Sequence, residues 1–252
     1  QLAKAAVMIG LGKSIAELKA EGYLPKNMDG ASLPQNTAIA VKAAVLPFSR
    51  FRTPEGVVVD SLLSPEMRST GEVMGLDTLY DTAFAKAQAG AGSPLPTEGK
   101  VFVSVANHDK RNVIIYAKML EQLGFEIVST GGTADVLRRN GVNSTVASKF
   151  AEANGQHSIV DMVRNGEIDL ILNTPAGGAA RSDGYEIRAA AVSVGCPVMT
   201  TISEFAAAVQ AITALREHSW GIISLQEHNE YLHTASSGEQ EDSNQVREGE
   251  LS

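Results

Sequence analysis

Residues 129–134 read Ser-Thr-Gly-Gly-Thr-Ala, a run of glycines and hydroxyl residues between a strand-like segment and a helix-like one. The adjacent glycines let the backbone approach an anion closely, and Thr130 and Thr133 add hydroxyl donors. The first turn of the helix adds unpaired N–H groups and the positive end of the helix dipole. The pattern favours a phosphate-binding turn, although an ordinary glycine turn with a threonine cap has the same composition.

Strand-like and helix-like segments alternate after residue 99. The strand-like runs cover 100–105, 125–128, 168–173, 197–199 and 220–225. The helix-like segments cover 109–123, 133–139, 157–165, 181–194 and 203–215. Short loops between alternating elements are typical of a parallel sheet covered by helices on both faces. The sequence therefore predicts an α/β fold with a parallel five-stranded, Rossmann-like sheet.

Polar residues follow several of these strands. Because the carboxyl ends of parallel strands meet at one edge of a sheet, we expect them to converge there on a ligand. Asn107, Asp109, Thr200 and Thr201 stand at such ends, where each could also be a simple cap. The residues predicted to hold a small anion, such as a phosphorylated metabolite, are Lys110, Thr130, Gly131, Gly132, Thr133, Lys149, Asn173 and Thr174.

Composition narrows the class of protein. The formal charge of −8 argues against nucleic-acid binding, which favours a basic stripe, and much of the acidic excess lies beyond His228. No apolar run is long enough to cross a bilayer. Cys196 is the only cysteine, which fits a reducing cytoplasm, and we interpret it as structural. The scattered histidines do not suggest a metal site.

The chain divides into three predicted parts, 1–92, 93–228 and an acidic disordered tail over 229–252. The boundary lies in the Pro- and Gly-containing stretch 91–99, which has the composition of a linker. The first part, with predicted helices at 2–18 and 78–89 and a strand at 41–48, has too few apolar elements for a core of its own. We expect it to pack against sequence that precedes Gln1.

The run Glu-Met-Arg-Ser-Thr-Gly-Glu-Val-Met at 66–74, with Val-Leu-Pro-Phe at 45–48, resembles the end of the second ATP-grasp half of the carbamoyl-phosphate synthase large subunit. Residues 101–228 are similar to the methylglyoxal-synthase-like regulatory domain of that family. The resemblance implies a cytoplasmic ligase that makes carbamoyl phosphate for pyrimidine and arginine synthesis. Its substrates are bicarbonate, ammonia from a glutaminase small subunit, and two ATP.

The resemblance also implies what this piece does. Its ATP and its Mg²⁺ or Mn²⁺ would be held upstream of Gln1, so we expect no catalytic residue, metal or cofactor here and no activity from the fragment alone. A nucleotide monophosphate effector, uridylate or inosinate, would bind at Lys110, Thr130, Thr133, Lys149 and Asn173. The other expected partners are the N-terminal part of the large chain, the small subunit and further copies in an oligomer.

Four positions depart from the family pattern. Pro175 and Gly178 stand where effector-binding relatives often have threonine and arginine, which could change the ligand. Ala43 and Val198 replace an acidic and an aromatic residue, so we do not expect control by ornithine.

Two other functions remain open. A stand-alone lyase of the methylglyoxal synthase type would need a carboxylate base beside the phosphate. The candidates are Asp183, inside a predicted helix, and Asp109, better suited to capping one. A docking module is supported by the acidic tail and the apolar first part.

Overall fold

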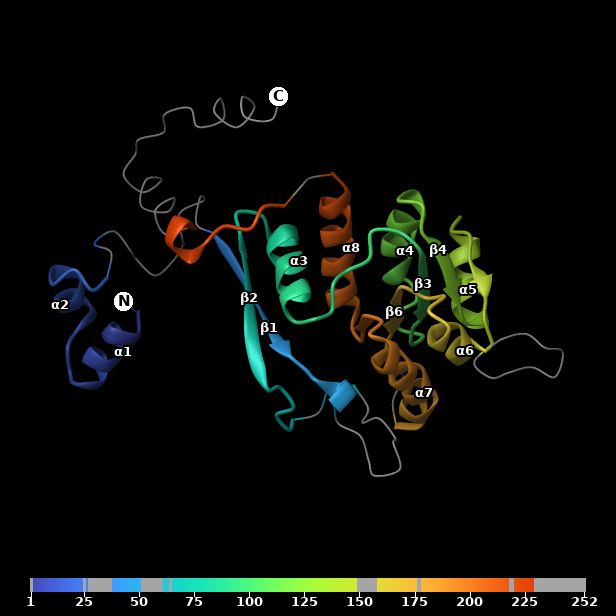
Figure 1. The fold of residues 1–252 in the computed structure, drawn as a ribbon, viewed down its shortest axis with the longest axis horizontal. Helices are drawn as coiled ribbons and strands as arrows, with labels where there is room; N and C mark the ends of the chain where they lie inside the picture. Colours follow the sequence, from blue (N-terminus) through green and yellow to red (C-terminus); the bar gives the residue numbers. More distant parts are fainter. Residues whose placement is uncertain are drawn as a thin grey trace. The chain divides into compact units, whose positions relative to one another are not determined.

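The computed structural model describes residues 2–24, 26, 38–50, 61–63, 65–148, 158–175, 178–217 and 220–228 (Figure 1). The chain forms two compact units. One comprises Gln1–Thr37 with Ser224–Ser252, and the other comprises Ala38–Ile223. None of the described helices has the length and apolar character needed to cross a lipid bilayer.

The first unit contains two short helices, α1 (Leu2–Gly10) and α2 (Ile15–Ala20), where the sequence predicted one interrupted helix. The turn between them contains Gly12, whose positive φ of 98° suits glycine. Ser14 then caps α2 by a capping box with Glu17. Most apolar side chains of α1 are exposed, Leu2 at 72%, for example.

The second unit is built on a parallel five-stranded sheet in the order β5-β4-β3-β6-β7. The strands are β3 (Lys100–Ser104), β4 (Glu126–Ser129), β5 (Thr145–Val146), β6 (Leu170–Asn173) and β7 (Val198–Met199). The central strand β3 pairs with β4 and β6, so that Phe102 lies between Val128 and Ile171.

Helices cover both faces of the sheet (Figure 1). They are α4 (Val113–Gln122), α5 (Gly131–Arg139), α6 (Ile159–Arg164), α7 (Gly178–Val194) and α8 (Ile202–Glu217). Val101 and Val103 belong to one core with α4, α5 and α8, whereas Phe102 belongs to the other with α6 and α7. This alternation, with every β6 residue buried, is what a sheet buried on both sides requires. The predicted fold class is confirmed.

The fifth strand is not the one expected. Residues 220–223 form no strand, and Ile222 is 90% exposed, so the predicted strand at 220–225 is wrong. The edge position is taken instead by β5, whose two residues pair with Val128 and Ser129 of β4. Thr145 and Val146 are both exposed, so this strand has no run of apolar residues from which it could have been predicted.

Two antiparallel strands, β1 (Ile39–Val45) and β2 (Gly71–Asp77), pack against helix α3 (Tyr80–Gly90). A short 3₁₀ turn, η1 (Phe48–Arg50), follows β1. The approach of β2 to α3 is close at Gly75, where a Cβ would overlap the carbonyl oxygen of Ala83. The sequence predicted α3 as 78–89 and β1 as 41–48, each to within a few residues of its observed bounds. It did not predict β2.

Helix α3 also contacts α8, and Leu95 and Phe84 belong to the core on the α8 face of the sheet. The stretch 91–99 therefore lies within one compact unit, and the boundary predicted at 92/93 does not coincide with a boundary of that unit. The division into three domains stays a prediction.

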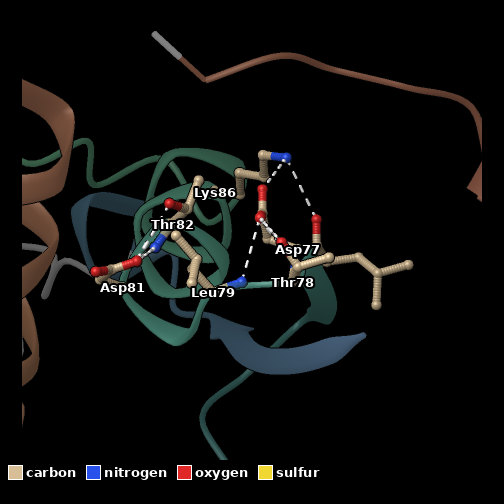
Figure 2. Close-up of polar contacts among 7 residues, drawn as sticks. Asp77, Thr78, Leu79, Asp81, Thr82 and Lys86 are labelled. Carbon is tan, nitrogen blue, oxygen red and sulfur yellow. Dashed lines mark hydrogen bonds and ion pairs between the residues drawn. The ribbon is translucent and has the colours of Figure 1, made fainter. Parts of the chain in front are cut away.

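The junction between β2 and α3 is held by one carboxylate (Figure 2). Asp77 accepts hydrogen bonds from the N–H groups of Thr78 and Leu79 at 2.7 and 3.3 Å, and from Lys86 Nζ at 2.7 Å. Leu79, the N-cap residue of α3, has no side-chain oxygen to offer, so Asp77 supplies the acceptor at this helix start.

Candidate anion-binding site

A cavity of about 130 Å³ lies where β3, β4 and β6 end. We call it the strand-end cavity. The strands that follow β3 are added first on one side of it, as β4 and β5, and then on the other side, as β6 and β7. Open α/β sheets bind ligands at such a reversal of strand order. The cavity is lined by Ser104, Val105, Ala106, Lys110, Thr130, Gly132, Thr133, Asn173, Thr174 and Gly184.

The first turn of α5 forms one wall. Thr130 is the N-cap residue, and its carbonyl oxygen accepts from the N–H groups of Thr133 and Ala134, both at 2.8 Å. Its hydroxyl does not cap the helix backbone and instead donates to the Thr133 hydroxyl at 3.3 Å. The N–H groups of Gly131 and Gly132 precede these bonds, so the helix itself offers them no acceptor. This wall therefore presents donors at the positive end of a helix dipole.

Lys110 brings a positive charge to the same place. An ideal Cβ on Gly132 would lie 3.0 Å from Lys110 Nζ, so the ammonium sits directly over this glycine. The lysine is half-buried, and within the described residues its Nζ has no hydrogen bond or ion pair. The ammonium is therefore available to an anion bound at the start of α5.

Asn173, at the end of β6, is oriented by a buried arginine of α7. Arg188 is fully buried, and its Nη1 donates to Asn173 Oδ1 at 2.9 Å. Since this bond occupies the amide oxygen, the Nδ2 hydrogens are left to donate. Gly184 makes the arrangement possible, because a Cβ there would overlap Arg188 Nη1 and come within 2.6 Å of Asn173 Oδ1.

Thr174 fixes the loop that follows β3. Its Oγ1 accepts from the N–H of Ala106 at 2.8 Å, and its own N–H donates to the Ser104 carbonyl at 3.1 Å. The hydroxyl hydrogen of Thr174 stays available, because the recorded bond uses only an oxygen lone pair.

The structure brings together most of the residues that the sequence singled out. Those lining the strand-end cavity are Lys110, Thr130, Gly132, Thr133, Asn173 and Thr174. Gly131 is the neighbouring first residue of α5. Lys149 lies outside the described residues. The role of this set in binding an effector stays a prediction.

Other candidates lie elsewhere. Thr200 and Thr201 cap α8: Glu204 Oε2 accepts from the Thr200 N–H, and Thr201 Oγ1 accepts from the Glu204 N–H, both at 3.2 Å. Burial raises the pKa of Glu204, although the Thr200 N–H opposes this shift. Asn107 lines a neighbouring cavity. Asp109 is not among the residues that line the strand-end cavity. Its carboxylate Oδ2 lies 3.4 Å from His108 Nε2.

Sequence reasoning missed Gly184 and Arg188. A glycine inside the helix-like stretch 181–194 was a usable sign of close packing, because glycine lowers helix stability. Arg188 had no such sign, since an arginine on a helix is exposed in most proteins.

Comparison with known proteins bears on the whole chain. Residues 112–200 match the MGS-like domain family. The carbamoyl phosphate synthase large chain of Kocuria rhizophila is 65% identical over 234 residues, which cover 92% of this chain and 21% of that protein. The protein of the same name from Pseudarthrobacter chlorophenolicus is 65% identical over 90% of this chain and 21% of its own length. That from Streptomyces coelicolor is 55% identical over 92% and 21%.

The chain thus spans about a fifth of the length of the curated relatives it matches. Because the similarity extends over nine-tenths of the chain, it includes sequence from both compact units and is not confined to the five-stranded sheet. The resemblance predicted from the sequence is confirmed: this chain is related to carbamoyl phosphate synthase large chains and carries an MGS-like domain.

Proposed function

We propose that this chain is the C-terminal regulatory region of a carbamoyl phosphate synthase large chain, and that the strand-end cavity binds the phosphate of a nucleotide monophosphate such as uridylate or inosinate. The observation that carries the proposal is the donor set of the cavity. An ammonium, a helix start, two threonine hydroxyls and an oriented amide meet there, and no carboxylate is among the described lining residues. Such a set is complementary to a phosphate.

The whole enzyme would make carbamoyl phosphate from bicarbonate, glutamine-derived ammonia and two ATP in the cytoplasm. It would work with a glutaminase small subunit and assemble into an oligomer. Among the described residues, no group of three or more His, Cys, Asp or Glu side chains is placed to hold a metal ion. Following the resemblance to the large subunit, we assign ATP and its Mg²⁺ or Mn²⁺ to the rest of the large chain.

A route for regulation runs through α7. This helix carries Gly184 and Arg188, which touch the cavity or its asparagine, and it also contacts η1 next to β1. An anion that binds the Asn173 amide and moves it would also move Arg188, its hydrogen-bond partner. The contact of α7 with η1 would then change. Coupling of this kind between sites is worth about 1–3 kcal/mol.

Calorimetry on the 252-residue chain tests the binding step. We expect uridylate or inosinate to bind, and the affinity to fall roughly tenfold or more in Lys110→Met and in Thr133→Val. Lys118→Met is the matched control, because Lys118 is exposed on α4 and lines neither this cavity nor the next. Circular dichroism of each variant excludes unfolding as the cause. Equal heats for wild type and both site variants would reject the assignment.

The lyase alternative predicts turnover instead of binding alone. Incubation of the chain with dihydroxyacetone phosphate should give no methylglyoxal if the cavity only binds. Formation of methylglyoxal would favour the lyase, with the base to be sought outside the described lining residues.

A further inference from the structure

A second cavity, of about 590 Å³, adjoins the strand-end cavity. Lys110 lines both, so the two cavities are neighbours at this residue. We call the second one the α4–α5 cavity, because its walls come from the turn that leads into α4, the first turn of α4 and the far end of α5. Its lining residues are Asn107, Lys110, Arg111, Ile114, Val136, Arg139 and Asn140.

The charge of the α4–α5 cavity is one-sided. It is lined by three basic residues, Lys110, Arg111 and Arg139, and within the described residues the charged groups of these three have no hydrogen-bonding or ionic partner. No carboxylate is among its described lining residues. Cations that share a cavity repel one another unless an anion joins them.

The nearby acids do not neutralise this cluster. Asp109 lies 3.4 Å from His108 Nε2, and its side chain is 17% exposed. Asp135 stands one turn before Arg139 on α5, but it forms no ion pair in the described part of the chain and does not line the cavity.

Position on the helix does not by itself account for Arg139. A basic residue in the last turn complements the helix dipole, and Arg138 already does so while donating to the Ser144 carbonyl. Arg139 instead lines the cavity, where its guanidinium could bind a phosphate in bidentate fashion. Ile114 and Val136, both half-buried, give the same cavity an apolar wall.

We infer that the α4–α5 cavity is a second anion subsite of the same binding site. The site would then also accept an organic phosphate with at least two phosphate groups, one in each cavity, with Lys110 between them and the carbon skeleton against Ile114 and Val136. The inference rests on the proposed function, because it needs a phosphate in the strand-end cavity. It extends that function from a monophosphate to a ligand that carries a second phosphate group.

Inorganic probes separate the two ideas. Calorimetry of the full chain with orthophosphate, pyrophosphate and tripolyphosphate compares one charge centre with several. We expect tripolyphosphate to bind roughly tenfold or more tighter than orthophosphate. In the double variant Arg111→Gln/Arg139→Gln this preference should fall to about twofold, while orthophosphate affinity stays within about twofold of wild type. Both arginines are exposed, so the fold should tolerate the exchange.

Arg164→Gln is the charge-matched control, since Arg164 is exposed on α6 and lines neither cavity. It should keep the preference for tripolyphosphate. If orthophosphate binds but tripolyphosphate binds no tighter, or if the double variant keeps the preference, the second subsite is overturned and the proposed function stands. If no probe binds to the wild-type chain, both are overturned.

Discussion

Arg188 Nη1 donates a hydrogen bond to Asn173 Oδ1 at 2.9 Å, joining the middle of α7 to the end of β6. Arg188 is fully buried and Asn173 is 6% exposed; Asn173 lines the strand-end cavity, and Arg188 contacts it from behind without lining the cavity itself. The bond fixes which end of the amide faces a ligand. It also places a permanent positive charge near the position that we propose for the phosphate, where water screens it little.

This pair leads to a prediction for Asn173→Asp. The carboxylate can still accept from Arg188, and its charge is favourable beside a buried guanidinium, so the urea midpoint should be unchanged or higher. The variant lacks the Nδ2 donors and adds a negative charge to the cavity, so orthophosphate affinity should fall roughly tenfold or more. Calorimetry and urea unfolding on the same sample measure both. Unaltered affinity would show that Asn173 does not face the anion.

The two adjacent glycines of α5 should respond differently to alanine. A Cβ on Gly132 would lie 3.0 Å from Lys110 Nζ, whereas a Cβ on Gly131 would meet nothing within 4 Å. Neither glycine has a positive φ, so each exchange should be neutral or stabilise the fold by up to about 0.5–1 kcal/mol. Only Gly132→Ala should weaken orthophosphate binding, by roughly threefold to tenfold, because it displaces the ammonium. Equal affinities in the two variants would contradict the placement of Lys110.

Asp77 should make folding pH-dependent (Figure 2). Burial alone would raise its pKa, but the Lys86 hydrogen bond and the N–H groups of Leu79 and Thr78 hold the pKa below its ordinary value of 3.8. A folded-state pKa that is lowered stabilises the protein above the unfolded pKa, and this stabilisation is lost as the pH falls through the folded value.

Asp77→Asn should therefore lower the free energy of unfolding by about 1 kcal/mol near pH 7. The difference from wild type should shrink as the pH falls below about 3.8. Urea unfolding at several pH values checks this, with Lys86→Met completing a double-mutant cycle. A difference that is constant with pH, or a cycle without coupling, would mean that Asp77 does not act through its charge.

Cys196 should be unreactive in the folded protein. Burial, with a smaller contribution from the charge of Asp169, raises the pKa of its thiol to about 12. The thiolate is the reactive form, so a disulfide reagent near pH 8 should react with the native chain far more slowly than with the chain in urea. Because the folded pKa lies above the ordinary value of 9.0, stability should also fall as the pH rises beyond 9.0, and Cys196→Ala should remove that part of the fall. Rapid native labelling would contradict the burial.

The limits of the sequence reasoning are physical. The start of α5 was placed within two residues, because strand 125–128 and the glycines that follow it are local signals. β2 was missed because its run around Val73 is mixed in polarity and gains its place by pairing with β1 and packing on α3 through Gly75. The strand expected at 220–225 is absent although its sequence is suitably apolar, because this run has no partner strand in the described sheet.

The same distinction between local sequence signals and tertiary contacts applies to the candidate site. Strand-end residues such as Thr130 and Asn173 could be predicted, because topology alone brings the ends of parallel strands together. Gly184 and Arg188 act from the middle of α7, and their role depends on how one helix packs against one strand. The basic wall formed by Arg111 and Arg139 likewise exists only once α4 and α5 are neighbours.

The strand-end cavity is assembled from stretches as far apart in sequence as Ser104 and Gly184. No partially folded chain that lacks β6 or α7 can offer it, so an anion that binds there recognises only the completed sheet. At a concentration one hundred times its dissociation constant, such an anion would raise the melting point through about 2.7 kcal/mol of added stability. The amide hydrogens of Val101 and Phe102, in the middle of the central strand β3, would then exchange more slowly with solvent although these residues do not line the cavity.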